Sequence, residues 1–436
     1  MKIAIIGGGA SGMVLAYLLD QQGHSVTVYE WQSTLGGHIR TLNQNIQART
    51  NCPERLEAGV LEFSAKFTNF LALMRELDVP LVPVEVGSGL FFKEGRHFLS
   101  PVMIDRNFRG MQKWREFLQL EILYAQSLGL WLKTHRAWLE DLAGQPLSKY
   151  LSSESDHKIW LKLLTMYSYS MPYETIDDFP AALAIPSLRR YIFGDWYRIQ
   201  GGVYSYVEKI LSKFSGEVRL GTTITSVCRS DEAVQIEGKG SNAPLFAAQF
   251  DKVVFATPPD QVLSLLEDAR PDEVRRFQAW KPNYITTILH SDHALYKPYN
   301  ISRGAEFDFF QTNSGWGYNA YLNQMCGTTS KKSYSLAFNL EKEISPEKII
   351  HMQQHHTPFY DANSFRYRDE VIAANGENNT YHVGAYLSDG LHEGAVTSAM
   401  VVAEAIAAIA ASPPLITPPY PQRVGNTIYF TLPSTR

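Results

Sequence analysis

A glycine-rich turn near the amino terminus has the residue types and spacing that bind a dinucleotide. An apolar run predicts a buried strand over Ile3–Ile6, and the turn follows it directly. Gly7 permits a tight bend, Gly9 lets a pyrophosphate approach the backbone, and Gly12 lets the next helix pack closely. The start of that helix offers N–H groups to the anion. The residues expected to contact the dinucleotide here are Gly7, Gly9, Ala10, Ser11 and Gly12.

An acidic residue stands where the ribose of such a dinucleotide would lie. A helix pattern over Met13–Leu19 is followed by a second predicted strand, Ser25–Tyr29, which leads into Glu30. Glu30 lies 18 positions after Gly12, where its carboxylate can accept hydrogen bonds from ribose hydroxyls. Strand, turn, helix, second strand and acid follow the order of the dinucleotide-binding fingerprint, so a chance glycine turn is a poor explanation.

A second glycine pair indicates which dinucleotide is bound. Gly36 and Gly37 follow closely, then His38 and Arg40, and Arg40 can hold a phosphate. Simple NAD dehydrogenases do not need such a segment. It resembles the flavin amine oxidase, protoporphyrinogen oxidase and phytoene desaturase superfamily, above all its bacterial amine-oxidase-like FAD-binding branch. The resemblance implies FAD, with contacts from these four residues. It also implies an α/β fold in which a discontinuous Rossmann-like FAD-binding domain is joined to an α+β substrate domain.

The resemblance returns near the other end of the chain. Residues 381–386 predict a short strand, and an alanine-rich run predicts a helix over Thr397–Ala411. In the family, this helix begins at the flavin pyrimidine, where its dipole stabilises negative charge on the reduced ring. The positions that match are Gly384, Glu393, Gly394 and Val396. The N–H groups expected to face the flavin are those of Gly394, Ala395 and Val396. Ala385 departs from the family, because many members carry Asp after this glycine.

A third matching region lies in the middle of the chain. A glycine pair, Gly201–Gly202, precedes a helix pattern over Tyr206–Phe214, and Asp251–Ala256 predicts an apolar strand. The resemblance implies that the backbone at Val227 meets the adenine. Residues 238–243 repeat the glycine spacing, but a proline follows instead of a helix, so we predict a hairpin turn there. With no second dinucleotide site expected, NAD(P)H is not expected as the electron partner.

Composition restricts the other functions. The net charge of −4, from 40 basic and 44 acidic residues, gives no footprint for nucleic acid. The three cysteines, Cys52, Cys228 and Cys326, are isolated and lie outside the closing motif, so we expect FAD to be held non-covalently. We expect no metal site, although three histidines (His351, His355 and His356) would share a face at helical spacing.

No transmembrane segment is expected. The longest uncharged helical stretch, Ile122–Leu132, is shorter than the ~20 residues that span a bilayer. We therefore expect a cytoplasmic protein, for which peripheral membrane contact and the oligomeric state remain open.

The matching regions divide the chain. The FAD-binding domain is expected from 1–62, 201–274 and 371–412, the substrate-binding domain from 63–200 and 275–370, and a proline-rich tail from 413–436. In the substrate-binding ranges, helix patterns run over Phe63–Leu77 and Met111–Leu142, and strand patterns over Tyr284–Ser291, Gly317–Gln324 and Ser333–Leu340. Aromatic residues crowd these ranges, which favours a hydrophobic small-molecule substrate.

The catalytic residues are less well indicated. The candidates are His290, with Asp292 beside it, Tyr386 and His392, while His355 and His356 are alternatives. Many amine-oxidising relatives use a lysine, but we interpret Lys331, Lys332 and Lys342 as ordinary solvated side chains. The leading function is oxidation of a C–N or C–C bond by hydride transfer to the flavin. The alternative is redox-neutral isomerisation of an unsaturated fatty acid or similar lipid, and a non-catalytic flavoprotein is disfavoured by the complete cofactor motifs.

Overall fold

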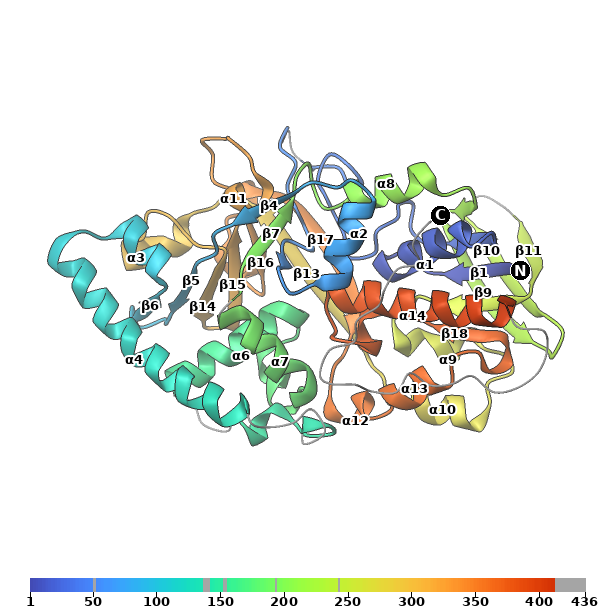
Figure 1. Cartoon of the computed structure of the whole chain (residues 1–436). Coiled ribbons are helices and arrows are strands. Elements are labelled where there is room, and N and C mark those ends of the chain that lie inside the picture. Colours follow the sequence, from blue (N-terminus) through green and yellow to red (C-terminus); the bar gives the residue numbers. More distant parts are fainter. Residues whose placement is uncertain (50–51, 136–141, 152–154, 193, 242–243, 412–436) are drawn as a thin grey trace.

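The computed structural model describes residues 1–49, 52–135, 142–151, 155–192, 194–241 and 244–411, so the proline-rich tail 413–436 lies outside it. Two groups of elements lie side by side (Figure 1). We call the group around the parallel sheet the nucleotide half, and the group around the larger sheet the aromatic half. Strands of the parallel sheet come from 1–62, 201–274 and 371–411, and strands of the larger sheet from 63–200 and 275–370.

The nucleotide half is built on a five-stranded parallel sheet with the order β18-β12-β1-β2-β8. Its strands are β1 (Lys2–Ile6), β2 (Ser25–Tyr29), β8 (Glu217–Arg219), β12 (Lys252–Phe255) and β18 (Thr380–His382). Side chains alternate along β1, so Ile3 and Ile5 pack on the helical side, whereas Ala4 and Ile6 join the core on the other side. This apolar alternation explains why the sheet is covered on both faces.

Helices cover one face of this sheet, and a small antiparallel sheet covers the other. The helical layer contains α1 (Ala10–Gln21), α2 (Thr68–Glu76), α8 (Ser205–Lys213) and α14 (His392–Ala411). The small sheet consists of β9 (Thr222–Arg229), β10 (Val234–Gly240) and β11 (Leu245–Phe250). Shorter helices complete this half: α9 (Val262–Leu265), α10 (Pro271–Phe277), α12 (Ala362–Phe365) and α13 (Arg368–Ala373).

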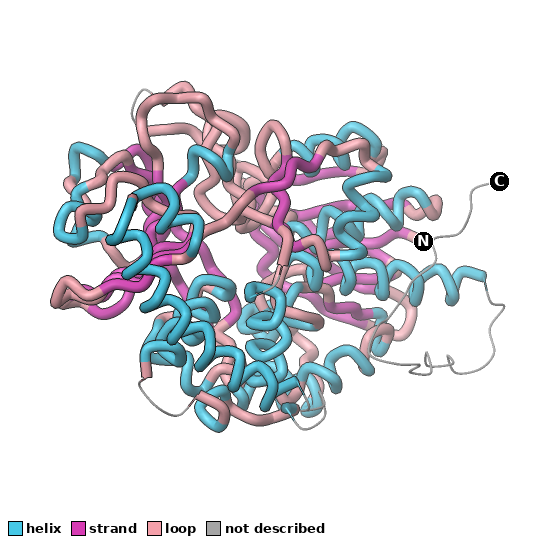
Figure 2. Tube along the Cα trace, turned by 60° about the vertical axis from the view of Figure 1, so that its left-hand side comes forward, coloured by secondary structure: helices cyan, strands magenta, loops and turns pink. Residues whose placement is uncertain are grey.

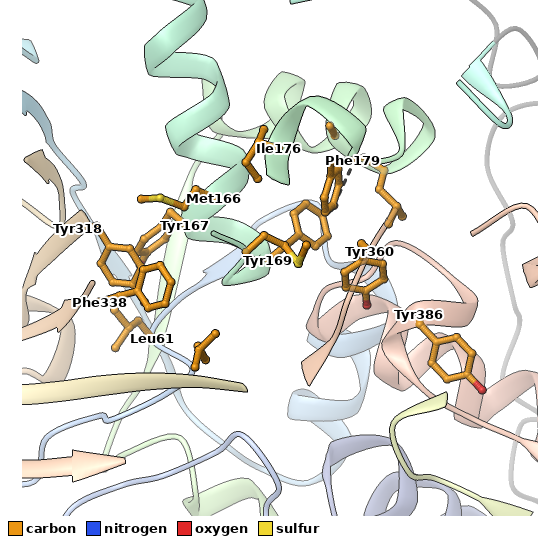
Figure 3. Packing of buried hydrophobic residues seen from close by; sticks show 14 of the residues in the cluster. Leu61, Met166, Tyr167, Tyr169, Ile176, Phe179, Tyr318, Phe338, Tyr360 and Tyr386 are labelled. Carbon is orange, nitrogen blue, oxygen red and sulfur yellow. Dashed lines mark hydrogen bonds between the residues drawn. The ribbon is translucent and has the colours of Figure 1, made fainter. Parts of the chain in front are cut away.

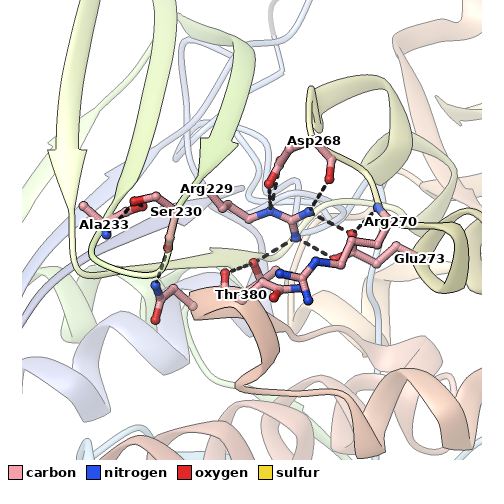
Figure 4. Close-up of polar contacts among 9 residues, drawn as sticks. Arg229, Ser230, Ala233, Asp268, Arg270, Glu273 and Thr380 are labelled. Carbon is pink, nitrogen blue, oxygen red and sulfur yellow. Dashed lines mark hydrogen bonds and ion pairs between the residues drawn. The ribbon is translucent and has the colours of Figure 1, made fainter.

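A buried ion-pair cluster ties the small sheet to the parallel sheet (Figure 4). The guanidinium of Arg229, at the end of β9, donates to Asp268 at 3.0 Å and to Glu273 at 2.5 Å. It also donates to the hydroxyl of Thr380 on β18 at 3.1 Å. Because Arg229 is buried, these carboxylates are required to offset the cost of removing its charge from water.

The aromatic half contains a seven-stranded mixed sheet with the order β17-β13-β16-β15-β14-β5-β6. Its strands are β5 (Ser88–Phe91), β6 (His97–Leu99), β13 (Pro282–His290), β14 (Phe307–Thr312), β15 (Gly315–Tyr321), β16 (Ser335–Phe338) and β17 (Ile349–Pro358). A three-stranded sheet is formed by β3 (Phe63–Ser64), β4 (Leu81–Val84) and β7 (Trp196–Ile199). The helices are α3 (Pro101–Asn107), α4 (Gly110–His135), α6 (Asp156–Tyr169), α7 (Ala181–Ile192) and α11 (Leu322–Cys326), and most lie along one side of the large sheet (Figures 1 and 2).

Short 3-10 turns join these elements. They are η1 (Leu147–Lys149), η2 (Tyr173–Asp178), η3 (Pro259–Gln261), η4 (Ala294–Tyr299), η5 (Glu341–Glu343), η6 (Pro346–Lys348), η7 (Glu377–Asn379) and η8 (Ala385–Leu387).

The expected hairpin at 238–243 is confirmed, since β10 and β11 pair antiparallel, although Gly238 itself still lies inside β10. Two local expectations were wrong. Phe63 and Ser64 do not begin a helix, because they pair with Tyr197 and Trp196 in β3, and α2 starts only at Thr68. The histidines at 351, 355 and 356 lie on the strand β17, so they do not share a helical face. Of the predicted helix Met111–Leu142, residues 111–135 belong to α4 and residues 136–141 lie outside the described residues.

Within the described residues, α14 is the one helix long and apolar enough to cross a membrane by length and composition. Half of its apolar window is buried inside the protein, where it packs against α1 and α2. The helix therefore serves as a core element of the nucleotide half.

Candidate active site

The glycine turn between β1 and α1 is tightly constrained by its neighbours. Gly7 has φ +113, and a Cβ on it would lie 2.6 Å from the carbonyl oxygen of Ala256. A Cβ on Gly12 would collide with the carbonyl oxygen of Gly7. Gly9 differs, because the nearest atom to its Cβ position is the Cα of Gly37 at 3.8 Å. Glycine at 7 and 12 shapes the turn, and glycine at 9 leaves space beside it.

The start of α1 has donors to offer. Gly9 occupies the N-cap position and no side chain caps the helix, which leaves the N–H groups of Ala10, Ser11 and Gly12 for an outside acceptor. Beside the turn, the buried hydroxyl of Thr257 has no hydrogen-bond partner among the described residues. Uncapped N–H groups and an unpartnered hydroxyl at one glycine turn fit a bound pyrophosphate.

Glu30 lies next to this turn at the end of β2. Its carboxylate accepts hydrogen bonds from the N–H of Gly8 at 2.8 Å and of Gln32 at 2.9 Å. Burial raises the pKa of Glu30, while these N–H groups and the charge of Arg40 oppose that rise. Each carboxylate oxygen keeps a second lone pair, so Glu30 can still accept from two ribose hydroxyls.

The second glycine loop packs directly on the first. The N–H of Gly36 donates to the carbonyl of Gly8 at 2.8 Å, and a Cβ on Gly37 would lie 3.0 Å from the Cα of Gly9. His38, which follows, keeps an accessible side chain, although burial lowers its pKa. From this loop His38 reaches the strand β17, where its Nε2 donates to the carbonyl of His356 at 2.8 Å.

Arg40 braces the second glycine loop. It is buried, and it donates to the carbonyls of Leu35 at 3.0 Å and Ile39 at 3.1 Å and to the side chain of Gln32 at 2.7 Å. These bonds hold the loop in shape. A guanidinium has five N–H donors, so a phosphate contact from Arg40 stays a prediction.

The closing segment satisfies some of the N–H groups that were expected to face the flavin. The side chain of Asp389 accepts from the N–H groups of Leu391 at 2.9 Å and Gly394 at 2.8 Å, and Ala395 donates to the carbonyl of Leu391. Gly394 and Ala395 therefore have acceptors already, and Val396 is buried inside the helix. The N–H groups of His392 and Glu393, in the first turn of α14, have no partner within the helix.

Two matched residues of the closing motif serve the fold. The carboxylate of Glu393 accepts from the N–H groups of Asn69 and Phe70, both at 2.9 Å, and so caps the start of α2. Gly384 is required because a Cβ there would lie 2.6 Å from the ring of Tyr386. The hydroxyl of Tyr386 is buried without a hydrogen-bond partner among the described residues, and burial raises its pKa.

Val227 lies five residues after the start of β9. Its carbonyl accepts from the N–H of Glu267 at 3.1 Å. The start of the same strand lies beside Glu30, because Thr222 donates from its N–H to the carbonyl of Glu30 at 2.9 Å. A backbone contact between Val227 and the adenine stays a prediction.

Two of the three catalytic candidates are held in structural positions. His290 is buried in β13, where it bonds to Asn319 at 2.7 Å, and burial lowers its pKa to about 4. Asp292 uses its carboxylate to accept from backbone N–H groups, so the two do not act as a pair. His392 bonds to the hydroxyl of Tyr206 at 2.7 Å, and burial lowers its pKa to about 3. Tyr386 alone retains an unpartnered polar atom.

A different group of polar side chains meets the second glycine loop. The hydroxyl of Thr287 donates to the carbonyl of Ala58 at 2.7 Å, and Nε2 of His355 donates to the same carbonyl at 3.0 Å. The rings of His355 and His38 lie 5.7 Å apart, edge to face. Burial lowers the pKa of His355 to about 3 and also lowers that of His38, so both imidazoles are neutral at pH 7.

The segment that follows Ala58 leads into the aromatic half. Four residues later, the carboxyl of Glu62 accepts from the hydroxyl of Tyr167 at 3.1 Å, and burial raises the pKa of Glu62 to about 8. The ring of Tyr167 lies 4.7 Å from that of Phe307 and 4.9 Å from that of Tyr318. Figure 3 shows Tyr167 and Tyr318 beside Leu61, at one end of a cluster that extends to Tyr360 and Tyr386.

The comparisons with known proteins agree with this geometry. A family model described as flavin containing amine oxidoreductase matches residues 10–289, which is more than half of the chain. The chain belongs to this family. Its members use a flavin, and this protein is an FAD-dependent oxidoreductase of the amine oxidase and desaturase type.

Two curated relatives match short stretches. The FAD-dependent oxidoreductase oblC of Cochliobolus heterostrophus is 33% identical over 82 residues, which cover 19% of this chain and 16% of the relative. The zeta-carotene desaturase of Capsicum annuum is 34% identical over 77 residues, 18% of this chain and 12% of the relative. The matched stretches therefore span less than a fifth of the length of either relative.

Solved structures of the family share the whole fold. The CLA-producing fatty acid isomerase of P. acnes has a TM-score of 0.67 at 16% identity and covers 92% of this chain and 98% of its own. Putrescine oxidase bound to putrescine (TM-score 0.66, 14% identity) and the cyclohexylamine oxidase of Brevibacterium oxydans IH-35A (0.66, 14%) each cover 94% of this chain and 99% of their own. At these identities the likeness shows the fold alone, the amine-oxidase-like architecture expected from the sequence.

Members of the flavin containing amine oxidoreductase family require a site for the cofactor, and the described residues fit one. The uncapped start of α1 and the unpartnered Thr257 hydroxyl suit the pyrophosphate, Glu30 suits the adenosine ribose, and the start of α14 at His392 and Glu393 suits the flavin pyrimidine. Sequence reasoning missed Thr287 and Glu62. The signal for both is a polar residue within an apolar run, Thr287 in Ile285–Leu289 and Glu62 between Leu61 and Phe63.

Proposed function

We propose that this protein uses non-covalently bound FAD to oxidise a hydrophobic small molecule at a C–N or C–C bond. The bound flavin supplies the chemistry by accepting a hydride, and the residues of the chain bind the substrate and control protons around it. The observation that carries the proposal is the segment 58–62. One end is bonded to Thr287 and His355 beside the second glycine loop, and the other to Tyr167 in the aromatic cluster.

The polar side chains around this segment are uncharged at pH 7, which suits a largely apolar substrate. His38 and His355 are neutral imidazoles, and Nε2 of His38 donates to the carbonyl of His356 at 2.8 Å. Nδ1 of His38 then carries a lone pair that can accept a proton. Glu62, with its raised pKa, is a neutral hydrogen-bond donor at pH 7. The lysines at 331, 332 and 342 are all exposed, which fits their interpretation as solvated side chains.

A redox-neutral isomerisation of an unsaturated fatty acid or similar lipid is the second candidate. Two observations favour it. The aromatic cluster around Tyr167 suits an unsaturated chain, and the likeness to the fatty acid isomerase of P. acnes (TM-score 0.67) equals the likeness to the amine oxidases. In such a reaction the hydride returns to the substrate, so the flavin ends oxidised.

Anaerobic mixing separates the two candidates. The purified protein is mixed with panels of amines, fatty acids and polyenes while flavin absorbance is followed. An oxidation bleaches the flavin until oxygen is admitted, whereas an isomerisation converts substrate over many turnovers and leaves the flavin oxidised. Conversion over many turnovers without oxygen and with the flavin still oxidised would overturn oxidation, and stoichiometric bleaching would overturn isomerisation.

Non-covalent binding has its own test. Within the described residues, no cysteine lies in the closing segment, since Cys52, Cys228 and Cys326 lie elsewhere in the fold. Acid precipitation should release yellow FAD into the supernatant. Colour retained in the pellet would show covalent attachment.

A further inference from the structure

One helix carries much of the exposed apolar surface of this protein. Half of the twelve exposed large hydrophobic side chains among the described residues lie on α4. They are Met111 (89% exposed), Trp114 (72%), Leu118 (68%), Ile122 (63%), Leu128 (48%) and Leu132 (54%). Their spacing of three, four or six residues places them along one side of the helix. Isolated exposed apolar residues are normal, but a continuous stripe marks an interaction site.

The stripe is not the side of α4 that packs against the rest of the protein. The opposite side of α4 carries the buried Leu120 and Leu123, and it packs against α3, β6 and α6. Tyr124 on that side approaches Trp160 of α6 with ring centroids 6.1 Å apart. Figure 1 shows α4 as the long helix at the outer edge of the aromatic half, with α3 and α6 on its inner side. The helix therefore has two apolar faces, and only one of them serves the fold.

Some charged side chains in and beside α4 are paired within the protein, and others are not. The acid Glu116 is turned inward, where it meets His97 at 3.2 Å, and Lys113 pairs with Asp105 at 2.6 Å. Arg109 and Arg115 are exposed, and neither has a carboxylate partner within the described residues. The other acid of α4, Glu121, is exposed. From 105 to 133 the chain carries five basic and three acidic residues, a net charge of +2, although the whole chain carries −4.

We propose that the exposed face of α4 docks this protein on an anionic lipid surface. An apolar stripe that includes Trp and is flanked by unpaired arginines is the pattern of a helix that lies in the plane of a membrane interface. A second copy of the chain would bring the same two unpaired arginines to the contact, which favours an anionic lipid over self-association. The inference goes beyond the proposed function and does not depend on it.

Docking through α4 would bring the proposed substrate region close to the membrane. The inner face of α4 packs on α6, and α6 also carries Tyr167, which bonds to Glu62 at the edge of the aromatic cluster. A hydrophobic substrate concentrates in a bilayer, so a protein seated by α4 would meet that substrate at its source. Docking is thus expected on the side of the molecule that holds the proposed substrate region.

Vesicle sedimentation of the whole protein tests the proposal. Vesicles of phosphatidylcholine alone are compared with vesicles of phosphatidylcholine mixed with phosphatidylglycerol. We expect the parent to sediment with the mixed vesicles, and added salt to weaken binding because it screens the charges. The double variant L118Q/I122Q should lower the partition coefficient at least tenfold, and R109Q/R115Q should remove the preference for phosphatidylglycerol.

The matched control is Leu245→Gln, because Leu245 is 74% exposed but lies on β11 in the nucleotide half. It should sediment as the parent does, and all variants should keep the parent's flavin content and melting temperature. The proposal is overturned if the parent ignores the mixed vesicles or if L118Q/I122Q binds them equally well. A dimer in light scattering that L118Q/I122Q dissociates, without vesicle binding by the parent, would assign this face to a second copy instead.

Discussion

Buried charged side chains have different partners in the two halves of this protein. In the nucleotide half, Arg229 meets two carboxylates, Arg40 meets two carbonyls and a side-chain oxygen, and Glu30 meets two N–H groups. In the aromatic half, burial raises the pKa of Glu62 to about 8 and that of Asp308 to about 7. Each half has an exception, because burial raises the pKa of Glu57 to about 7 in the first and Glu306 meets Arg106 at 3.5 Å in the second. The contrast is therefore clearest between Arg229, which has two carboxylate partners, and Glu62, which has no cationic partner among the described residues.

The contrast follows from what each half must do. A nucleotide site is built largely from backbone N–H groups and glycines, so its charged side chains are free to brace loops and sheets. A site for an apolar substrate excludes water, and a carboxyl there keeps its proton unless a cation pairs with it. Carboxyls with perturbed pKa values beside an aromatic cluster are therefore a feature of the chemical half of the molecule.

The largest expected effect concerns the paired charges. Arg229→Met should lower the free energy of unfolding by about 3–5 kcal/mol, because it leaves Glu273 buried without its partner. Arg219→Met is the matched control, since its pair with Glu217 is exposed and should contribute about 0–1 kcal/mol. Urea unfolding followed by circular dichroism measures both. Equal losses in the two variants would contradict the contrast.

The Arg229 effect should also depend on pH. Burial alone would raise the pKa of Glu273, but the bonds and charge of Arg229 lower it below its usual range. A lowered folded-state pKa gives stability that is present above the unfolded pKa, about 4.5, and is lost as the pH falls. The difference between Arg229→Met and the parent should therefore shrink from pH 7 towards pH 4.

The next effect concerns the ribose site. Glu30→Ala should weaken FAD binding at least tenfold, because charge-assisted hydrogen bonds contribute about 1.5–3 kcal/mol each and tenfold requires about 1.4 kcal/mol. Loss of the acceptors for Gly8 and Gln32 should loosen the turn as well. Fluorescence titration of the apoprotein with FAD gives the dissociation constant. The control is Glu217→Ala, an exposed acid on the neighbouring strand β8, and equal affinity in both variants would remove Glu30 from the site.

The sequence predicts the nucleotide half well because its signals are local. Gly7, Gly12 and Glu30 lie in one unit of strand, turn, helix and strand, and the parallel sheet with helices and a second sheet around it has the architecture expected for the family. Other details of the site depend on individual hydrogen-bond partners. Asp389 satisfies Gly394, Glu267 satisfies Val227, and neither bond can be inferred from spacing.

The aromatic half was less predictable for the same reason. Thr287, His355 and Ala58 come from β13, β17 and a loop, and only the folded sheet brings them within 3.1 Å. His290 suggested a catalytic base by its place at a strand end, but whether such a histidine faces a site or the interior depends on strand pairing. Glu62 is recognisable as unusual only once its burial is known.

The third effect tests the poised carboxyls. The folded-state pKa of Glu62, about 8, lies above its unfolded value near 4.5, so between these values the folded protein holds one extra proton. The free energy of unfolding should then fall as the pH rises from 5 to 8. Glu62→Gln removes this titration and should flatten the profile by about 1–2 kcal/mol, after allowance for partial access to water.

Thermal unfolding at a series of pH values measures that profile. Glu85→Gln, which changes an exposed acid in the same half, should leave the slope of the parent unchanged. If the free energy of unfolding varies with pH in the same way in the parent and in Glu62→Gln, Glu62 is ionised in the folded protein. Glu62 would then no longer support the contrast between the two halves.

The smallest effect joins the two halves at the start of α14. The open N–H groups of His392 and Glu393 should face the flavin pyrimidine, where reduction places negative charge. His392→Pro removes one donor, and proline is tolerated in the first turn of a helix, so the fold should persist. A helix terminus contributes about 0.3–1 kcal/mol, and up to ~2 kcal/mol when partly buried, so the midpoint potential should fall by roughly 6–40 mV.

His392→Ala is the control that isolates the N–H group, because it also loses the imidazole and the bond to Tyr206 but keeps the donor. Dye-equilibrated redox titration should show a lower potential in His392→Pro than in His392→Ala, with FAD bound in both. An equal drop in the two variants would assign the effect to the imidazole. No drop in either would mean that the dipole of α14 points away from the flavin, and the open donors at its start would then serve another ligand.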